Sequence, residues 1–296
     1  MSYRVRSGRA DDLARLAAFT KETFRWGDYV ADAYLGWLDD PAIEVLVVEH
    51  AAEGPVAMAA LKQPGPHQAW LAAARVHPDH RRRGLASLMN DTAVEWARER
   101  GDRVARLLIE DWNEAPQRQV EALGFRRTSR WLHASRSGLL ADPNPTTNGG
   151  PRVPGPERLE PASRVGAVDA WPVWERARIT RAARGLIGRH WMWWRLTPDD
   201  LARFAADGLL WSCPSGWVVA EVDDDAVVVE WLCPHGDDVR RLTKACVDLA
   251  VEHRCDTLEF IVPDHPSARA AIERLSMVPE SMSIWEKPLQ AGPRRP

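Results

Sequence analysis

Apolar and polar positions along the first half of the chain alternate in a way that predicts strands and helices in turn. Four short apolar runs read as strands. They are Val45–Val48, Val56–Leu61, Trp70–Val76 and Val104–Ile109. Two segments, Asp11–Glu22 and Leu85–Ala97, instead repeat their apolar residues at helical spacing, and Gly101 follows the second as a stop. We therefore expect an α/β (α+β) domain, with a mixed, mostly antiparallel sheet flanked by helices.

The same order of elements returns in the second half of the chain. Strands are expected at Trp217–Glu221, Ala226–Leu232 and Thr257–Val262, and a helical stripe at Leu242–Ala250. Residues 138–157 between the halves are rich in Pro, Gly, Asn and Thr, and they have little to bury. Repetition of a whole domain plan indicates a duplication. The predicted organisation is a domain at 1–137, a linker at 138–157, a second domain at 158–290 and a tail at 291–296.

Composition limits the classes of partner. The chain has 296 residues, 45% hydrophobic and 27% charged, and its net charge of -3 gives no reason to expect nucleic acid or an anionic membrane. The N-terminus has no apolar signal region, and no apolar run is long enough to span a membrane, so we expect a cytoplasmic protein. We expect it to be a monomer or a homodimer. The four cysteines match neither a zinc knuckle nor a disulfide framework, which favours reduced thiols and no metal. They are Cys213, Cys233, Cys246 and Cys255.

The passage from Arg75 to Ala86 carries the clearest chemistry. It reads RVHPDHRRRGLA, which begins as a strand end, continues through a basic turn and finishes as a helix start. A helix N-terminus exposes unpaired N–H groups and the positive end of its dipole, so it favours a pyrophosphate. Gly84 and the small Ala86 allow the backbone to approach such a group closely. The His77–His80 segment within this passage has the composition of a turn and is not expected to bind a metal.

This passage resembles the signature of the GNAT superfamily, Arg/Gln-x-x-Gly-x-Gly/Ala after the fourth strand. A second segment, Asn113–Phe125, looks like that family's fourth helix with its terminal Gly-Phe. The resemblance covers about Arg4 to Arg136. It implies acyl transfer from acyl-CoA, acetyl-CoA by default, to an amine.

The resemblance also implies which residues hold the cofactor. The backbone at Arg75 and Val76 would bind the pantetheine arm and polarise the thioester carbonyl, as a preorganised N–H donor can. Asn113 would contact the cofactor, or a water beside it, from the loop after the fifth strand. The pyrophosphate would be held by the turn and the helix start. These residues are Arg81, Arg82, Arg83, Gly84, Leu85, Ala86 and Ser87.

The sequence departs from the family pattern at two positions that matter for catalysis. Family members commonly have a tyrosine where Val120 stands, and its phenol protonates the departing thiolate. An alkyl thiol has a pKa near 8.5 and leaves tolerably without such an acid. The fourth strand also lacks the glutamate that often serves as base, so Glu110 and Asp111 are the candidate catalytic residues, with His77 as a further possibility.

The second half resembles a GNAT repeat that has lost its cofactor site. When Pro234 is matched with Pro78, the carboxylates of Asp237 and Asp238 fall where a diphosphate would sit and would repel it. Ser276–Met277 replaces the terminal Gly-Phe. The many tryptophans of this half fit either core packing or an aromatic wall for an acceptor. They include Trp171, Trp174, Trp191, Trp193, Trp194, Trp211, Trp217 and Trp231.

The sequence as a whole predicts a tandem GNAT protein that acylates the amine of a small molecule with acyl-CoA bound to its first domain. Acylation of a protein or peptide amine is the alternative within enzymes. A non-catalytic acyl-CoA-binding or sensor protein is the alternative from another class, because the usual tyrosine and glutamate are missing.

Overall fold

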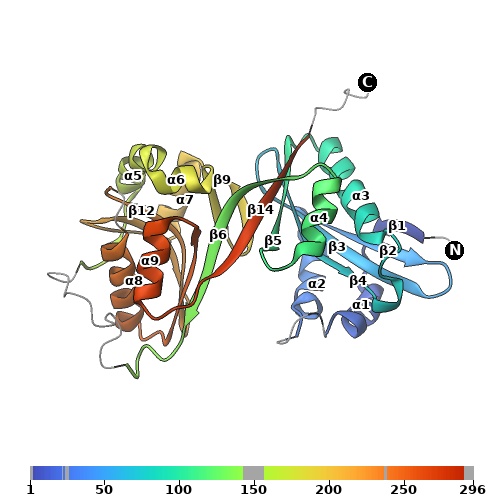
Figure 1. Ribbon diagram of the computed structural model, residues 1–296, viewed down its shortest axis with the longest axis horizontal. Coiled ribbons are helices and arrows are strands. Elements are labelled where there is room, and N and C mark those ends of the chain that lie inside the picture. The colour runs from blue at the N-terminus through green and yellow to red at the C-terminus, as the bar shows by residue number, and fades with distance from the viewer. Residues whose placement is uncertain (1–2, 22, 24–26, 143–156, 237–238, 290–296) are drawn as a thin grey trace. The chain divides into compact units, whose positions relative to one another are not determined.

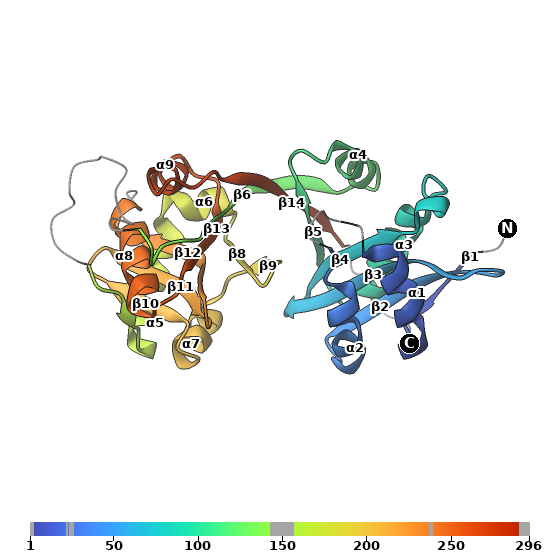
Figure 2. The same cartoon turned by 90° about the horizontal axis from the view of Figure 1, so that it is seen from below.

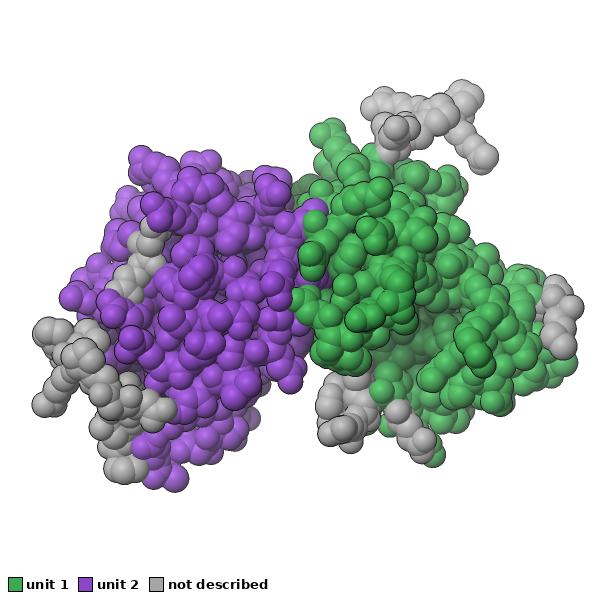
Figure 3. All heavy atoms as spheres, in the orientation of Figure 1, with its two compact units in different colours: residues 1–127, 285–296 green, residues 128–284 purple. Residues whose placement is uncertain are grey.

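The computed structural model describes residues 3–21, 23, 27–142, 157–236 and 239–289. The chain divides into two compact units, which Figure 3 shows in different colours. Unit 1 consists of residues 1–127 and 285–296, and unit 2 of residues 128–284. Within the described ranges, no helix is both long and apolar enough to cross a membrane.

Unit 1 is a sheet covered by helices on both faces (Figure 1). Its strands, in sheet order, are β1 (Tyr3–Ser7), β2 (Ile43–His50), β3 (Gly54–Gly65), β4 (Gln68–Val76), β5 (Val104–Glu110) and the end of β14 (Glu280–Pro288). Its helices are α1 (Leu13–Thr20), α2 (Val30–Asp39), α3 (Leu85–Glu99) and α4 (Glu114–Ala122), with short 3-10 turns η1 (Ala10–Asp12) and η2 (Pro78–His80). Strands β1 to β4 pair antiparallel, whereas β4 and β5 are parallel. The strands and the second helix predicted for this half are confirmed, while α1 is shorter than Asp11–Glu22 and Glu22 lies outside the described residues.

The two faces of this sheet have separate cores. Helices α1 and α2 pack Leu16, Tyr34 and Trp37 on one face, and α3 and α4 pack Ala93, Val120 and their neighbours on the other. Alternate residues of a strand point to opposite faces. The odd-numbered residues 105, 107 and 109 of β5 lie in the α3–α4 core. Glu110, the next residue, therefore faces the side of α1 and α2.

Unit 2 repeats this plan with additional elements. Its sheet order is the start of β14, then β6 (Arg126–Arg136), β13 (Thr257–Pro263), β12 (Ala226–Pro234), β11 (Gly216–Val222), β10 (Leu210–Cys213) and β7 (Glu160–Pro161). Its helices are α5 (Arg164–Arg176), α6 (Arg178–Ala183), α7 (Pro198–Ala206), α8 (Arg240–Glu252) and α9 (Pro266–Arg274). Strands β8 (Leu186–Arg189) and β9 (Met192–Arg195) form a separate hairpin, visible in Figure 2. The three strands and the helix predicted here are confirmed as β11, β12, β13 and α8.

The border between the units differs from the predicted one at two strands. β6 was expected in the first domain, but residues 128–136 belong to unit 2, where Trp131–Arg136 pair with β13. In turn, the end of β14 belongs to unit 1, where Trp285 and Leu289 pack in the α3–α4 core. Each sheet thus includes a strand from the other half of the sequence. Such long-range pairing is not encoded in local hydrophobic spacing.

The predicted linker begins later than residue 138. The backbone N–H groups of Gly138 and Leu140 donate to the carboxylate of Asp256, and that of Leu139 donates to its carbonyl. These bonds hold the start of the segment against unit 2. Residues 143–156, the rest of the predicted linker but for its last residue, lie outside the described residues.

Candidate active site

Strands β4 and β5 part from one another half-way along the sheet of unit 1. They pair only from Gln68–Trp70 to Val104–Arg106, although β4 runs on to Val76 and β5 to Glu110. On its other edge β4 stays paired with β3 as far as Val76. Among the described residues, the pairing of β4 with β5 thus ends at Trp70. A place where two strands part in this way can take up an extended ligand.

A bulge in β4 accompanies this parting. Met58 and Ala60 of β3 pair with Arg75 and Ala72, so two residues of β4 stand opposite Ala59. Ala73, in the bulge, has φ of +54°, a left-handed conformation that is uncommon for a residue with a side chain. A bulge bends the strand that carries it and redirects its backbone groups, and bulges are frequent next to active sites. The predicted residues Arg75 and Val76 follow directly after it.

The basic turn ends in a glycine whose backbone conformation favours glycine. Gly84 has φ of +78° and is the N-cap of α3, a helix of 15 residues with no acidic side chain in its first turn. A Cβ added to Gly84 would meet no atom within 4 Å, so crowding by the protein does not explain the residue. The open space leaves the first N–H groups of α3 at Leu85, Ala86 and Ser87 accessible to an anion.

The three arginines of the turn are exposed, and two of them are anchored. Arg81 Nε donates to the carbonyl of Val76 at 3.4 Å, and Arg83 Nη1 donates to the Tyr3 hydroxyl at 3.1 Å. The Tyr3 hydroxyl also lies 3.1 Å from Nδ1 of the buried His80, whose Nε2 lies 3.2 Å from Glu53. The turn is thereby tied to β1 and to the β2–β3 connection. Sequence reasoning missed this support, because Tyr3 is 77 residues from His80 and 80 residues from Arg83.

The end of β5 and the loop after it present Glu110, Asp111 and Asn113 on one short segment. Gln117 holds it in place: its Nε2 donates to the carbonyls of Glu110 and Asp111, at 3.2 and 3.0 Å. Asn113 is the N-cap of α4, yet its side chain makes no cap hydrogen bond and is left for another partner. Glu110 and Asp111 are both half-buried. Only Glu110 lies within the strand, where the alternation turns it to the face of α1 and α2.

An ion pair at the start of α2 lies on that same face. Arg75 Nε contacts Asp28 Oδ2 at 2.6 Å, the Asp28 side chain is fully buried, and its Oδ1 accepts the N–H of Val30. The Arg75 guanidinium also lies over the ring of Tyr29, 5.4 Å from its centroid. Burial raises the pKa of the Tyr29 phenol, the charge of Arg75 opposes this, and Asp28 and Glu110 add to it.

Three further residues of unit 1 have structural roles. Val120 is buried in the α3–α4 core. The hydroxyl of the buried Tyr34 donates to the carbonyl of Arg9 at 3.1 Å. His77 Nδ1 accepts the N–H of Asp79 at 3.2 Å and so caps η2. Among the described residues, no group of three or more His, Cys, Asp or Glu side chains is placed to hold a metal ion.

Comparison with known proteins identifies the first unit. Residues 11–125 match the model of the acetyltransferase (GNAT) family. These residues form a GNAT domain. A comparison with curated protein sequences finds no match. An acyl-CoA co-substrate is what membership of this family implies.

Solved structures show that the whole chain has the fold of tandem GNAT proteins. A tandem GNAT protein from the clavulanic acid biosynthesis pathway is 17% identical and matches 99% of this chain and 100% of its own, with a TM-score of 0.59. A GCN5-related N-acetyltransferase from Sphaerobacter thermophilus is 14% identical, over 98% and 97% of the chains, with a TM-score of 0.66. Another from Kribbella flavida is 16% identical, over 98% and 73%, with a TM-score of 0.55. At such identities the likeness concerns the fold.

The second GNAT-like unit keeps the parting of its parallel strands but carries larger side chains there. β12 and β13 pair only from Ala226–Val229 to Thr257–Phe260, much as β4 and β5 do. Beyond that point β12 carries Glu230, Trp231, Leu232 and Cys233, all buried, whereas the corresponding stretch of β4 carries Leu71 and three alanines, Ala72–Ala74. Trp231 packs against Trp174 of α5 with ring centroids 4.9 Å apart. This stretch of β12 is thus used for core packing in the second unit.

The turn before α8 also differs from the phosphate turn of the GNAT domain. It spans residues 235–239, against residues 77–84 in unit 1. Its N-cap, Val239, has φ of −87° instead of the left-handed conformation of Gly84. Because the turn before α8 is shorter than the turn before α3, the two turns cannot be aligned residue by residue by matching Pro234 with Pro78. Asp237 and Asp238 lie outside the described residues.

Two further features of unit 2 agree with a degenerate repeat. Ser276 has a positive φ of +62° and is followed by the buried Met277. Gly124 likewise has a positive φ in unit 1 and is followed by the buried Phe125. Most of the tryptophans are buried, which confirms the core-packing interpretation for them. They are Trp174, Trp193, Trp194, Trp211, Trp217 and Trp231. Two of the eight differ: Trp171 is half-buried, and Trp191 is 47% exposed at the turn of the β8–β9 hairpin.

Proposed function

We propose that unit 1 binds acyl-CoA, acetyl-CoA by default, along the parted edge of β4 and transfers the acyl group to the amine of a small molecule. One observation carries this proposal. The parting of β4 from β5 after Trp70 and the open turn at Gly84 follow one another in the chain. An extended thioester with a pyrophosphate at one end matches that arrangement. The edge would bind the pantetheine arm, and the N-terminus of α3 the pyrophosphate.

In this proposal Glu110 is the general base. An acceptor amine must be neutral to attack, so a carboxylate has to take its proton, directly or through one water. Glu110 faces the side of the sheet where Arg75 and Tyr29 lie, whereas Asp111 follows the strand. After attack, the carbonyl oxygen carries negative charge, which the backbone N–H groups at Arg75 and Val76 would stabilise. The carbon–sulfur bond then breaks and CoA leaves as a thiolate, which takes its proton from solvent.

A non-catalytic acyl-CoA-binding protein is the second candidate function, and Val120 is the observation that favours it. This residue stands where a tyrosine acid is expected by resemblance, and it is buried in the core. The two candidates differ in one product. An enzyme releases free CoA when an amine is present, whereas a binding protein does not.

The test is release of free thiol from acetyl-CoA with a panel of amines. The panel contains small polyamines, amino sugars, amino acids and peptides. For an amine that is turned over, Glu110→Gln should lower the rate about a hundredfold while leaving the affinity for acetyl-CoA unchanged. Asp111→Asn is the matched control and should be close to wild type. Equal losses in both variants would contradict the assignment of the base, and no thiol release with any amine would favour the binding protein.

A further inference from the structure

The turn before α3 is too exposed to be fixed by burial. Residues 81–84 are all exposed, and two of them adopt left-handed conformations, Arg82 with φ of +62° and Gly84 with φ of +78°. A left-handed conformation is unfavourable for an arginine and persists where neighbouring contacts impose it. Contacts made by side chains therefore have to hold this turn in shape.

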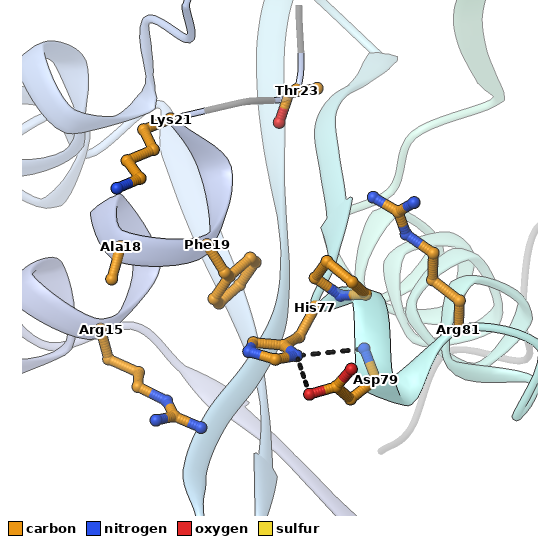
Figure 4. Close-up of a pocket in the computed structure, with 9 residues that line it drawn as sticks. Arg15, Ala18, Phe19, Lys21, Thr23, His77, Asp79 and Arg81 are labelled. Atoms are coloured by element: carbon orange, nitrogen blue, oxygen red, sulfur yellow. Dashed lines mark hydrogen bonds and ion pairs between the residues drawn. The ribbon is translucent and has the colours of Figure 1, made fainter.

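Two side chains of the turn reach such contacts, in different places. Arg81 points away from His77 in Figure 4, and its Nε donates to the carbonyl of Val76 at 3.4 Å. That hydrogen bond is long and leads only to the strand end directly before the turn. Arg83 instead donates from Nη1 to the hydroxyl of Tyr3 at 3.1 Å. Since Tyr3 lies on β1, this second contact ties the turn to a distant part of the sheet.

The Tyr3 hydroxyl is itself oriented by a buried histidine. His80 is 2% exposed, its Nδ1 lies 3.1 Å from the hydroxyl, and its Nε2 lies 3.2 Å from Glu53. Hydrogen bonding by His80 lowers the pKa of the Glu53 carboxyl, so at neutral pH this carboxylate can only accept. Nε2 thus carries a proton, and the Nδ1 of a neutral imidazole accepts the hydrogen of the hydroxyl. The oxygen lone pairs of Tyr3 remain for the guanidinium of Arg83.

Ring contacts keep the Tyr3 side chain in place independently of its hydroxyl. The ring lies edge-on to His80 with centroids 5.9 Å apart, and 5.3 Å from the ring of His50. The two imidazoles are 5.2 Å from one another. A phenylalanine at position 3 would keep these contacts and lose one oxygen. The link between the sheet and the turn can therefore be removed with little other change.

We propose that Tyr3 is a positioning residue of the cofactor site, whose hydroxyl holds the turn before α3, through Arg83, in the conformation that receives the pyrophosphate. This inference rests on the proposed function, because it concerns binding of the same acyl-CoA. Tyr3 does not touch the reacting atoms. Its effect is preorganisation: the N–H groups at the start of α3 are already aimed when the cofactor arrives, so binding does not have to order the turn.

The experiment compares Tyr3→Phe with Tyr34→Phe by calorimetric titration of the full chain with acetyl-CoA. Both changes remove one hydroxyl from a hydrogen-bonded tyrosine of unit 1, but that of Tyr34 donates to the carbonyl of Arg9. Tyr3→Phe should weaken binding about tenfold, as loss of a hydrogen bond to a charged group predicts. Tyr34→Phe is the matched control, and it should lower the melting temperature while leaving the affinity unchanged.

A double-mutant cycle shows whether Tyr3 acts through Arg83. In the Arg83→Met background, Tyr3→Phe should change the affinity for acetyl-CoA less than about twofold, because the group that the hydroxyl holds is gone. With an amine that is turned over, Tyr3→Phe should raise the KM for acetyl-CoA and leave kcat unchanged. That division is expected of a residue that positions the cofactor without touching the reacting atoms.

The outcomes separate this inference from the proposed function. Unchanged affinity in Tyr3→Phe, or equal losses in Tyr3→Phe and Tyr34→Phe, would overturn the role of Tyr3 and leave the cofactor site intact. A tenfold loss that persists in the Arg83→Met background would overturn it too, as would a lower kcat at unchanged KM. Absence of acetyl-CoA binding by the wild type would contradict the proposed function itself.

Discussion

The ion pair between Arg75 and Asp28 gives a prediction whose size follows from burial. The carboxylate of Asp28 is fully buried, and Arg75, with 11% of its side chain exposed, is bonded to it at 2.6 Å. Arg75→Met removes the partner and leaves the carboxylate in an environment that solvates it poorly. Breaking a buried pair in this way costs about 3–5 kcal/mol of unfolding free energy. Asp28 keeps the N–H of Val30, so we expect the lower end, about 3 kcal/mol.

A double-mutant cycle measures this coupling. Asp28→Asn removes the charge but keeps an oxygen that can accept the N–H of Val30. In that background Arg75→Met should cost about 1 kcal/mol or less, because no buried charge is left unpaired. Urea unfolding followed by tryptophan fluorescence provides the free energies, with the change expected in the transition of unit 1. If Arg75→Met costs the same in both backgrounds, the pair does not join β4 to α2 as described.

Three further changes test the assignment of structural roles. The pKa of Asp12 is lowered: burial alone would raise it, but the hydrogen bonds from Arg6 and from the Arg9 N–H outweigh burial. The carboxylate therefore stabilises the folded state fully above pH about 4, and this stabilisation is lost as the pH falls below that value. Thermal unfolding across pH should show Asp12→Asn destabilised at pH 7 and approaching wild type as the pH falls; a constant difference would contradict this sign. Val120→Ala should cost about 2 kcal/mol through lost core packing, with turnover per folded molecule unchanged; a loss of turnover at unchanged stability would give this residue a catalytic role. Trp193→Ala should cost about 3–5 kcal/mol and Trp191→Ala less than about 0.5 kcal/mol, because only the first is fully buried; similar melting temperatures would refute the contrast.

Local sequence was sufficient for most of the GNAT domain. The apolar runs of β2 to β5 and the helical stripe of α3 are strong periodic signals, and Gly101 ends that helix in a left-handed conformation, with φ of +80°, as a stop signal predicts. The division between the units could not be read in this way. Residues 128–136 and 285–289 continue the strand patterns of their own halves. Only the pairing of strands far apart in the chain places them in the other unit.

The candidate site was predictable only where it is built from segments that are continuous in the sequence. The turn and the loop after β5 are contiguous segments with recognisable composition, and both lie in unit 1 as expected. The Asp28–Arg75 ion pair and the Tyr3–His80–Glu53 contacts were missed, since each joins elements distant in sequence. The one available signal was Asp28-Tyr29 directly before a helical stripe, a position where an aspartate commonly caps a helix. Burial of Trp193 but not of Trp191 likewise depends on how the β8–β9 hairpin folds over its neighbours.

The central claim is a single cofactor site per chain, formed by the parted edge of β4 and the turn at Gly84. Calorimetric titration of the full chain with acetyl-CoA tests it most directly. We predict a stoichiometry of one and loss of binding in Gly84→Glu, which would place a strained residue and a negative charge against the phosphates. Two equivalent sites per chain, or binding that survives this substitution in a folded variant, would contradict the account.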